Sequence, residues 1–215
     1  MPQIETKPSQ SRWLAIGDIH GCLAQLTKLM ELVHPAAVDR IVFLGDYVDR
    51  GPDSAGVIDY LIEFAEAFPK TVFLRGNHEQ MFLDYLDGLD PAMFLMNGGR
   101  QTLDSYRDRG MWPIPSSHRR FLDSLRYYFE SAQHIFVHAG LRPGIPLAGQ
   151  TDFDMLWIRG EFIESNDDWG KTVVYGHTPL KEPLLGDRRI GVDTGCVYGR
   201  QLTCCDVTSL RIWQV

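Results

Sequence analysis

The amino-acid sequence predicts an α/β fold, and three observations lead to that prediction. Short apolar runs alternate with amphipathic helical patterns through the first third of the chain. The first two of these runs end at a glycine that opens a polar cluster. The C-terminal segment contains further strand patterns separated by turn residues. Alternation of this kind is typical of a largely parallel sheet covered by helices.

The first part of the chain carries the alternation. Apolar runs at 13–16, 41–44 and 71–74 predict three strands. Between the first two, Leu, Met and Val recur at offsets 0, 3, 6, 7 and 10, which is one face of a helix over 23–33. A second helical pattern over 57–68 lies between two prolines. This β-α-β-α-β order implies parallel strands joined by crossover helices.

The pattern changes from about residue 87 to residue 130. Prolines and glycines there interrupt short helical pieces rich in Met, Phe and Tyr, so we expect a helical excursion over one edge of the sheet. Strands are predicted to resume at 135–137 and 172–175. The tail is expected to form antiparallel strands over 189–193, 201–207 and 209–215.

Composition narrows the class of protein. The chain has 215 residues, with 21 Lys and Arg against 28 Asp and Glu, a net charge of −7 that argues against nucleic acid or an anionic membrane as partner. Four cysteines are too few for a disulfide scaffold, and no apolar run reaches the length of a membrane span. We therefore expect a cytoplasmic protein with one domain over 13–215, preceded by a flexible arm over 1–12.

A short polar cluster follows nearly every predicted strand. The clusters read GDIHG (17–21), GDYVDRG (45–51), GNHE (76–79), HAG (138–140) and GHT (176–178). Ligands of parallel α/β sheets bind beyond the carboxyl ends of the strands, so these five clusters should meet at one site. Glycine at their edges permits tight turns and a close approach of the backbone.

The side chains in these clusters suit divalent metals. Carboxylate, amide and imidazole donors bind borderline ions such as Mn, Fe, Zn or Ni. Eight candidate groups are too many for one ion but fit two: Asp18, His20, Asp46, Asp49, Asn77, His78, His138 and His177. Four of the seven histidines lie in the clusters, which disfavours separate structural roles for them. For the other three, His34, His118 and His134, we expect solvated or capping roles.

The five motifs, in this order, resemble the metal-dependent phosphoprotein phosphatases, the PPP family of the calcineurin-like metallophosphoesterase superfamily. The likeness is greatest to compact bacterial and phage members of the lambda-phosphatase kind, and it spans about residues 13–207. It implies a sandwich of two mixed β-sheets flanked by helices. It also implies two divalent ions, with Mn favoured over Fe or Zn.

The resemblance assigns roles at the matching positions. It implies metal ligation by six residues: Asp18, His20, Asp46, Asn77, His138 and His177. Asp46 would bridge the two ions. His78 would be the general acid, oriented by Asp49. The phosphoryl oxygens would be bound by Arg50, Asn77 and, after a tryptophan as in bacterial members, Arg159.

The implied function is a serine/threonine phosphoprotein phosphatase, with phosphotyrosine as a further substrate. A hydroxide bridging the two metals would attack phosphorus in line with the leaving oxygen. Phosphorylated proteins or peptides would be the partners. The alternative is a symmetrical diadenosine tetraphosphatase, but such enzymes typically carry Ala in place of Asp49 and GNHD in place of GNHE. Phosphodiesterases of the superfamily generally lack the VDRG extension, so Asp49 and Arg50 argue against that class. A protein that only binds its ligand would have lost at least one metal-binding residue, and none is missing here.

Overall fold

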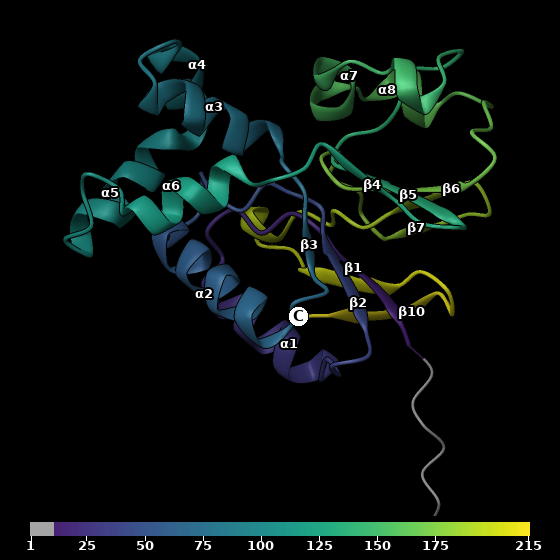
Figure 1. Ribbon diagram of the computed structural model, residues 1–215, viewed down its shortest axis with the longest axis horizontal. Helices are drawn as coiled ribbons and strands as arrows, with labels where there is room; N and C mark the ends of the chain where they lie inside the picture. Colours follow the sequence, from purple (N-terminus) through teal and green to yellow (C-terminus); the bar gives the residue numbers. More distant parts are fainter. Residues whose placement is uncertain (1–10) are drawn as a thin grey trace, which may run out of the picture.

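The computed structural model describes residues 11–215, which form two five-stranded sheets packed face to face (Figure 1). Strand order is β10-β9-β1-β2-β3 in the first sheet and β4-β5-β6-β8-β7 in the second. One apolar cluster fills the space between the sheets, and two others pack helices against their outer faces. The predicted sandwich of two mixed sheets flanked by helices is confirmed.

The first sheet contains the predicted parallel strands. Strands β1, β2 and β3 lie side by side in parallel and are connected by helices α1 and α2, as the alternation predicts. The C-terminal strands β9 and β10 extend this sheet in antiparallel orientation, beginning beside β1. The bounds are β1 (Trp13–Ile16), α1 (Leu23–Val33), β2 (Arg40–Phe43), α2 (Ser54–Ala67), β3 (Val72–Phe73), β9 (Thr203–Asp206) and β10 (Arg211–Gln214).

The second sheet differs from the expectation for the tail. Its inner strands β5, β6 and β8 are parallel, and β4 and β7 close the edges in antiparallel orientation. The sequence pattern predicts that the strand at 189–193 pairs in antiparallel orientation with the two strands that follow it. This prediction is wrong, because that strand is β8 of the second sheet, whereas β9 and β10 belong to the first sheet. Gly195, at φ +76°, and a 3-10 turn over Cys196–Tyr198 carry the chain between the sheets. The bounds are β4 (Tyr128–Glu130), β5 (His134–Val137), β6 (Thr172–Tyr175), β7 (Leu184–Leu185) and β8 (Arg189–Gly191).

The predicted helical excursion lies beside α2. It consists of short helices from residue 91 to residue 123, with a non-helical break over 109–115, and its last three residues form the edge strand β4. Asp90 begins α4 by accepting the backbone N–H of Met93, and Pro91 occupies the first helical position, where its missing N–H costs nothing. Helix α3 precedes the excursion directly. The bounds are α3 (Asn77–Leu86), α4 (Pro91–Phe94), a π-helical turn (Leu95–Gly99), α5 (Arg100–Asp108) and α6 (Ser116–Asp123).

Two short helices cover the outer face of the second sheet, and the sequence patterns did not predict them. These are α7 (Asp152–Trp157) and α8 (Gly160–Ile163), which follow a 3-10 turn over Leu147–Gly149. In Figure 1 they face α3 and α4 across the top of the molecule. Within residues 11–215, no helix is both long enough and apolar enough to cross a bilayer. The arm predicted over 1–12 lies almost entirely outside the described residues.

Candidate metal centre

The five polar clusters converge where the strands end, as predicted. Those of the first sheet follow β1, β2 and β3, and those of the second follow β5 and β6. The loops approach so closely that a Cβ on Gly76 would overlap the Asp46 carboxylate. At Gly45, a Cβ would lie 2.6 Å from the backbone N of Gly76. Glycine at these two positions therefore lets the Asp46 loop and the start of α3 meet.

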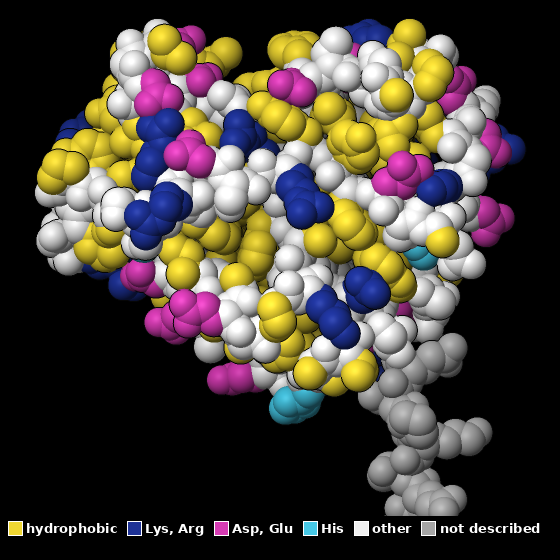
Figure 2. Space-filling model, in the orientation of Figure 1, with side chains coloured by type: hydrophobic (Ala, Val, Ile, Leu, Met, Phe, Trp, Pro, Cys, Tyr) yellow, Lys and Arg dark blue, Asp and Glu magenta, His cyan; other side chains and the backbone are white. Residues whose placement is uncertain are grey.

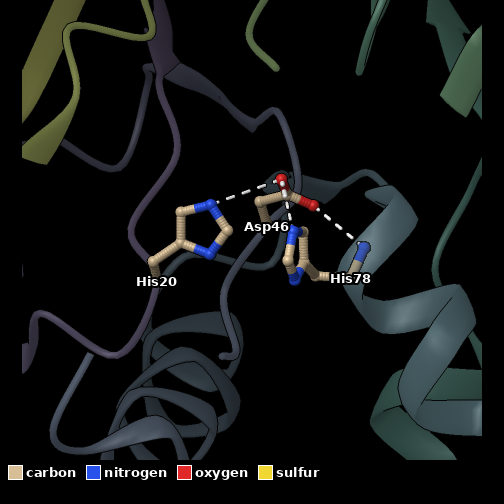
Figure 3. A group of neighbouring side chains, drawn as sticks. All are labelled: His20, Asp46 and His78. Atoms are coloured by element: carbon tan, nitrogen blue, oxygen red, sulfur yellow. Dashed lines mark hydrogen bonds and ion pairs between the residues drawn. The ribbon is translucent and has the colours of Figure 1, made fainter. Parts of the chain in front are cut away.

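The first group of donor atoms consists of His20, Asp46 and His78, all within 4.8 Å of one another (Figure 3). His20 Nδ1 lies 2.8 Å from the carbonyl oxygen of Val48. A carbonyl only accepts, so Nδ1 carries the proton and donates it. His20 Nε2 then offers a lone pair, which lies 3.5 Å from Asp46 Oδ2 and faces Arg50 Nη1 at 2.8 Å. This is the tautomer that a metal-binding histidine needs.

The second group consists of Asp46, His138 and His177, so Asp46 belongs to both. His138 Nδ1 donates to the carbonyl of Leu44 at 2.8 Å, which turns its Nε2 lone pair inward. That nitrogen lies 3.0 Å from Asn77 Oδ1 and 3.4 Å from Asp46 Oδ1. Three acceptor atoms thus face one another with no proton between them. A cation satisfies such an arrangement, and a shared carboxylate is what two neighbouring ions require.

The protonation states also suit metal binding. Burial lowers the pKa of His177 to about 2 and that of His20 to about 3, so both rings are neutral. Burial also lowers the pKa of His138. For Asp46, burial opposes ionisation, but the surrounding histidines outweigh it and hold its pKa well below the usual range. Among residues 11–215, the buried His177 Nε2 has no hydrogen-bond partner.

Asp18 borders these groups without belonging to either. Both of its carboxylate oxygens lie 3.1 Å from the backbone N of His177, whose N–H they accept. Burial, with the charges of Asp193 and Asp46, raises the pKa of Asp18 well above its usual range. Side-chain contacts of 3.0–3.5 Å therefore link five of the six predicted ligands into one chain, and the sixth, Asp18, contacts the backbone of His177.

His78 has different partners from the other buried histidines. Its Nδ1 lies 2.7 Å from Asp49 Oδ2, and its Nε2 lies 4.0 Å from Asp46 Oδ2. Burial would lower the pKa of His78, but the Asp46 charge and the Asp49 hydrogen bond outweigh it and raise that pKa. Thr102 of α5 donates to the other Asp49 oxygen at 2.6 Å and accepts the Asp49 backbone N–H at 2.8 Å.

Both predicted arginines lie at this site. Arg50 Nη1 is 2.8 Å from His20 Nε2, at the edge of the first donor group. Arg159 Nη1 donates to the carbonyl of His177 at 3.0 Å, at the edge of the second group. The Trp157 ring lies 6.3 Å from the His177 ring, edge to face. Positive charge therefore flanks the centre on both sides, supplied by one loop from each sheet.

Two supporting residues were missed by the sequence reasoning. Glu79 is fully buried and accepts the backbone N–H groups of Gly76, Asp46, Tyr47 and Val48 at 2.7–3.1 Å. It holds the Asp46 loop against α3, so a Glu in GNHE acts on this loop rather than on substrate. Thr102 is the second, and only its position after the Asn97-Gly-Gly99 segment could have pointed to it.

The three remaining histidines were predicted to be solvated or capping, and the structure corrects two of them. His34 does end α1, in the left-handed conformation, so its capping role is confirmed. His118 is buried between Tyr106 Oη and Asp59, with both contacts at 2.9 Å. His134 is buried within β5. Helix α6 brings His118 inward against α2 and α5, which its polar neighbours in the sequence do not indicate.

The site loops hold unusual backbone conformations. Within residues 11–215, seven residues other than glycine have positive φ. Five of them belong to the site clusters, with φ between 47° and 73°: His20, Asp46, Asp49, Arg50 and His177. Left-handed conformations at such residues are costly and concentrate at functional sites.

A family model described as calcineurin-like phosphoesterase matches residues 11–207. The chain belongs to the calcineurin-like phosphoesterases. Serine/threonine-protein phosphatase 1 of Salmonella typhimurium is 33% identical over 211 residues, with 94% of each chain covered. The asymmetrical bis(5'-nucleosyl)-tetraphosphatase PrpE of Bacillus subtilis is 30% identical over 220 residues, with 87% of each covered.

Solved structures confirm the calcineurin-like phosphoesterase fold. A protein proposed to be a diadenosine tetraphosphatase superposes with a TM-score of 0.72 at 24% identity, covering 100% of this chain and 95% of that one. The cold-active protein-tyrosine phosphatase of a Shewanella species gives 0.70 at 17% identity, covering 95% and 77%. Members of this family depend on binuclear metal centres, and the two donor groups that share Asp46 fit one.

Proposed function

We propose that this calcineurin-like phosphoesterase removes phosphate from phosphoserine and phosphothreonine, and also from phosphotyrosine, in proteins or peptides. The observation that carries the proposal is the His78–Asp49 pair: the two side chains are joined at 2.7 Å, and His78 belongs to the first donor group together with Asp46. A seryl alkoxide is a poor leaving group and must be protonated as it departs. The pair supplies a histidine that keeps its proton for this purpose.

The ligands of the proposed metal pair are Asp18, His20, Asp46, Asn77, His138 and His177, with Asp46 shared. Two bound divalent ions would activate a water near neutral pH and neutralise charge on the phosphoryl group. The donors are nitrogen and oxygen without a thiolate, a set that suits Mn best and also accepts Fe or Zn. The neutral state of His20 and His177 supports their assignment as ligands.

The remaining residues bind the phosphoryl group and hold a proton. Arg50 and Arg159 flank the two donor groups, and guanidinium forks match phosphoryl oxygens in geometry as well as in charge. Asn77 also has an amide NH₂ with which it can donate to such an oxygen. His78 Nδ1 donates its proton to the Asp49 carboxylate, so the proton that the charged ring can give up is the second one, on Nε2.

The second candidate is a dinucleoside tetraphosphatase, which relatives such as the Bacillus subtilis protein support. The alternative named from the sequence motifs is the symmetrical kind, whereas that relative is named as asymmetrical. Hydrolysis of a tetraphosphate releases a phosphate-type leaving group, which departs without a proton donor. The buried Asp49–His78 pair would contribute little to that reaction. Its presence therefore favours a phosphate monoester over a dinucleoside tetraphosphate as the substrate.

The test compares substrates on one preparation of Mn-loaded protein. We expect turnover of p-nitrophenyl phosphate and of phosphoseryl, phosphothreonyl and phosphotyrosyl peptides, with slower turnover of diadenosine tetraphosphate. Rapid cleavage of the dinucleotide without release of phosphate from any peptide would overturn the proposal in favour of the second candidate.

A further inference from the structure

A pocket of about 370 Å³ lies between helices α3 and α7. Its lining includes Met81 and Asp84 of α3, Asp90 and Met93 at the start of α4, and Phe153 and Trp157 of α7. We call it the α3–α7 pocket. Figure 2 shows a notch at the top of the molecule between the lobe of α3 and α4 and the lobe of α7 and α8, with apolar side chains on both sides.

The pocket adjoins the metal centre on two sides. Trp157 forms part of its wall, and the ring of that residue lies 6.3 Å from His177. On the other side, Met81 is four residues after Asn77 on the same helix, one turn or about 6 Å along its axis. A phosphate ester bound at the metal centre therefore has the α3–α7 pocket within reach of its neighbouring groups.

The lining combines apolar surface with unpaired negative charge. Phe153 is 67% exposed and stacks on Trp157, with 6.3 Å between the ring centroids. Asp84 accepts one hydrogen bond from Gln80, and Asp90 accepts one from the backbone of Met93. Both bonds use Oδ1. Among residues 11–215, neither carboxylate is in a salt bridge.

This chemistry matches one class of occupant. A lysine or arginine side chain has an apolar stem for Met81 and Met93 and a cationic head for the two carboxylates. The exposed Phe153 ring and the half-buried Trp157 ring add a cation–π surface, which guanidinium uses best. A nucleobase is neutral, so it would leave both carboxylates without a counter-charge.

We propose that the α3–α7 pocket binds an arginine or lysine side chain of the phosphoprotein substrate, close in sequence to the phosphorylated residue. This inference rests on the proposed phosphatase function and makes it more specific. Asp84 lies seven residues along α3 from Asn77, about 10 Å. An extended peptide advances about 3.5 Å per residue, so the basic residue should stand two or three positions from the phosphoserine.

The experiment measures kcat/KM on a set of phosphoseryl peptides. Each carries a single Arg at position −3, −2, +2 or +3, and the reference carries norleucine at all four. We expect at least one position at which Arg raises kcat/KM about 10-fold, the size of a charge-assisted hydrogen bond. In the D84N/D90N double variant this ratio should fall to about 1. Asparagine keeps the helix cap at position 90, so the variant removes charge and little else.

A matched control is Asp187→Asn, because Asp187 is an exposed carboxylate near the far edge of the second sheet. The ratio between Arg and norleucine peptides should stay at its wild-type value in this variant. Peptide turnover without an Arg preference, or a preference that survives D84N/D90N, would overturn the pocket assignment while leaving the phosphatase function intact. Hydrolysis of p-nitrophenyl phosphate without hydrolysis of any peptide would overturn both.

Discussion

The metal centre has two sides that use buried histidines differently. On the side of the proposed general acid, called the acid side here, His78 pairs with the Asp49 carboxylate, and its pKa is raised. On the ligand side, His138 pairs with the carbonyl of Leu44, and its pKa is lowered. The side chains of both histidines are almost fully buried, so exposure does not separate them.

The partner of Nδ1 makes the difference. A carboxylate stabilises the imidazolium that forms when the ring is protonated, whereas a carbonyl fixes the tautomer without supplying a full charge. The acid side therefore holds a proton and the ligand side offers lone pairs, within one cluster of side chains. A substitution on the acid side should therefore lower kcat without loss of metal, whereas a substitution on the ligand side should lower metal binding as well.

The largest expected effect comes from His78→Asn. Removal of a general acid costs about 10²- to 10⁴-fold in kcat on a phosphoseryl peptide, while the protein keeps both metals. The opposite variant is His138→Asn, which we expect to lose metal together with activity. Elemental analysis of dialysed protein, combined with kcat, distinguishes the two. Equal metal loss in both variants would remove the distinction between the two sides.

Asp49→Asn tests the pairing itself. The Asp49 carboxylate contributes to the raised pKa of His78, so its loss should lower that pKa. An acid works only while protonated, so the alkaline limb of the kcat profile should move to lower pH, with kcat reduced about 10- to 100-fold. Metal content should stay the same. Metal loss in this variant would show that Asp49 is a ligand.

Arg159→Ala probes the ligand side without removing a ligand. Loss of a charge-assisted contact to a phosphoryl oxygen should raise KM for small phosphates about 10-fold. The exposed Arg188, placed near the far edge of the second sheet, offers a matched control as Arg188→Ala. Unchanged KM in Arg159→Ala would exclude a role in phosphate binding.

The smallest expected effect is that of Thr102→Val. The hydroxyl of Thr102 donates to the Asp49 carboxylate on the side away from His78. Its loss should slow phosphoseryl hydrolysis only about 3- to 10-fold, because it acts on the reaction through Asp49 and not directly. Hydrolysis of p-nitrophenyl phosphate should slow less, because its leaving group needs little protonation. Thr102→Ser should restore the rate. Equal loss on both substrates would indicate a structural role alone.

The sequence predicts much of this molecule because the relevant signals are local. Strand runs such as 13–16 and the glycine-bounded clusters after them can be recognised from neighbouring residues alone, and they correctly predict that the five clusters meet at one place in the fold. The position of β8 in the second sheet was not predictable, since the sequence of a three-residue strand does not indicate which strand it pairs with. Thr102 was also beyond reach, because its contact with Asp49 spans 53 residues of chain. Such contacts exist only once the excursion has folded against α2.

The left-handed backbone at five site residues has a consequence for the stability of the whole protein. Each such conformation costs about 1–3 kcal/mol, and the acceptor atoms that it gathers repel one another. Ions bound between these atoms bind the folded chain and not the unfolded one, so they offset the strain by mass action. The melting temperature of this protein should therefore rise with the concentration of divalent metal. Without metal, the protein should unfold and be cleaved by proteases more readily.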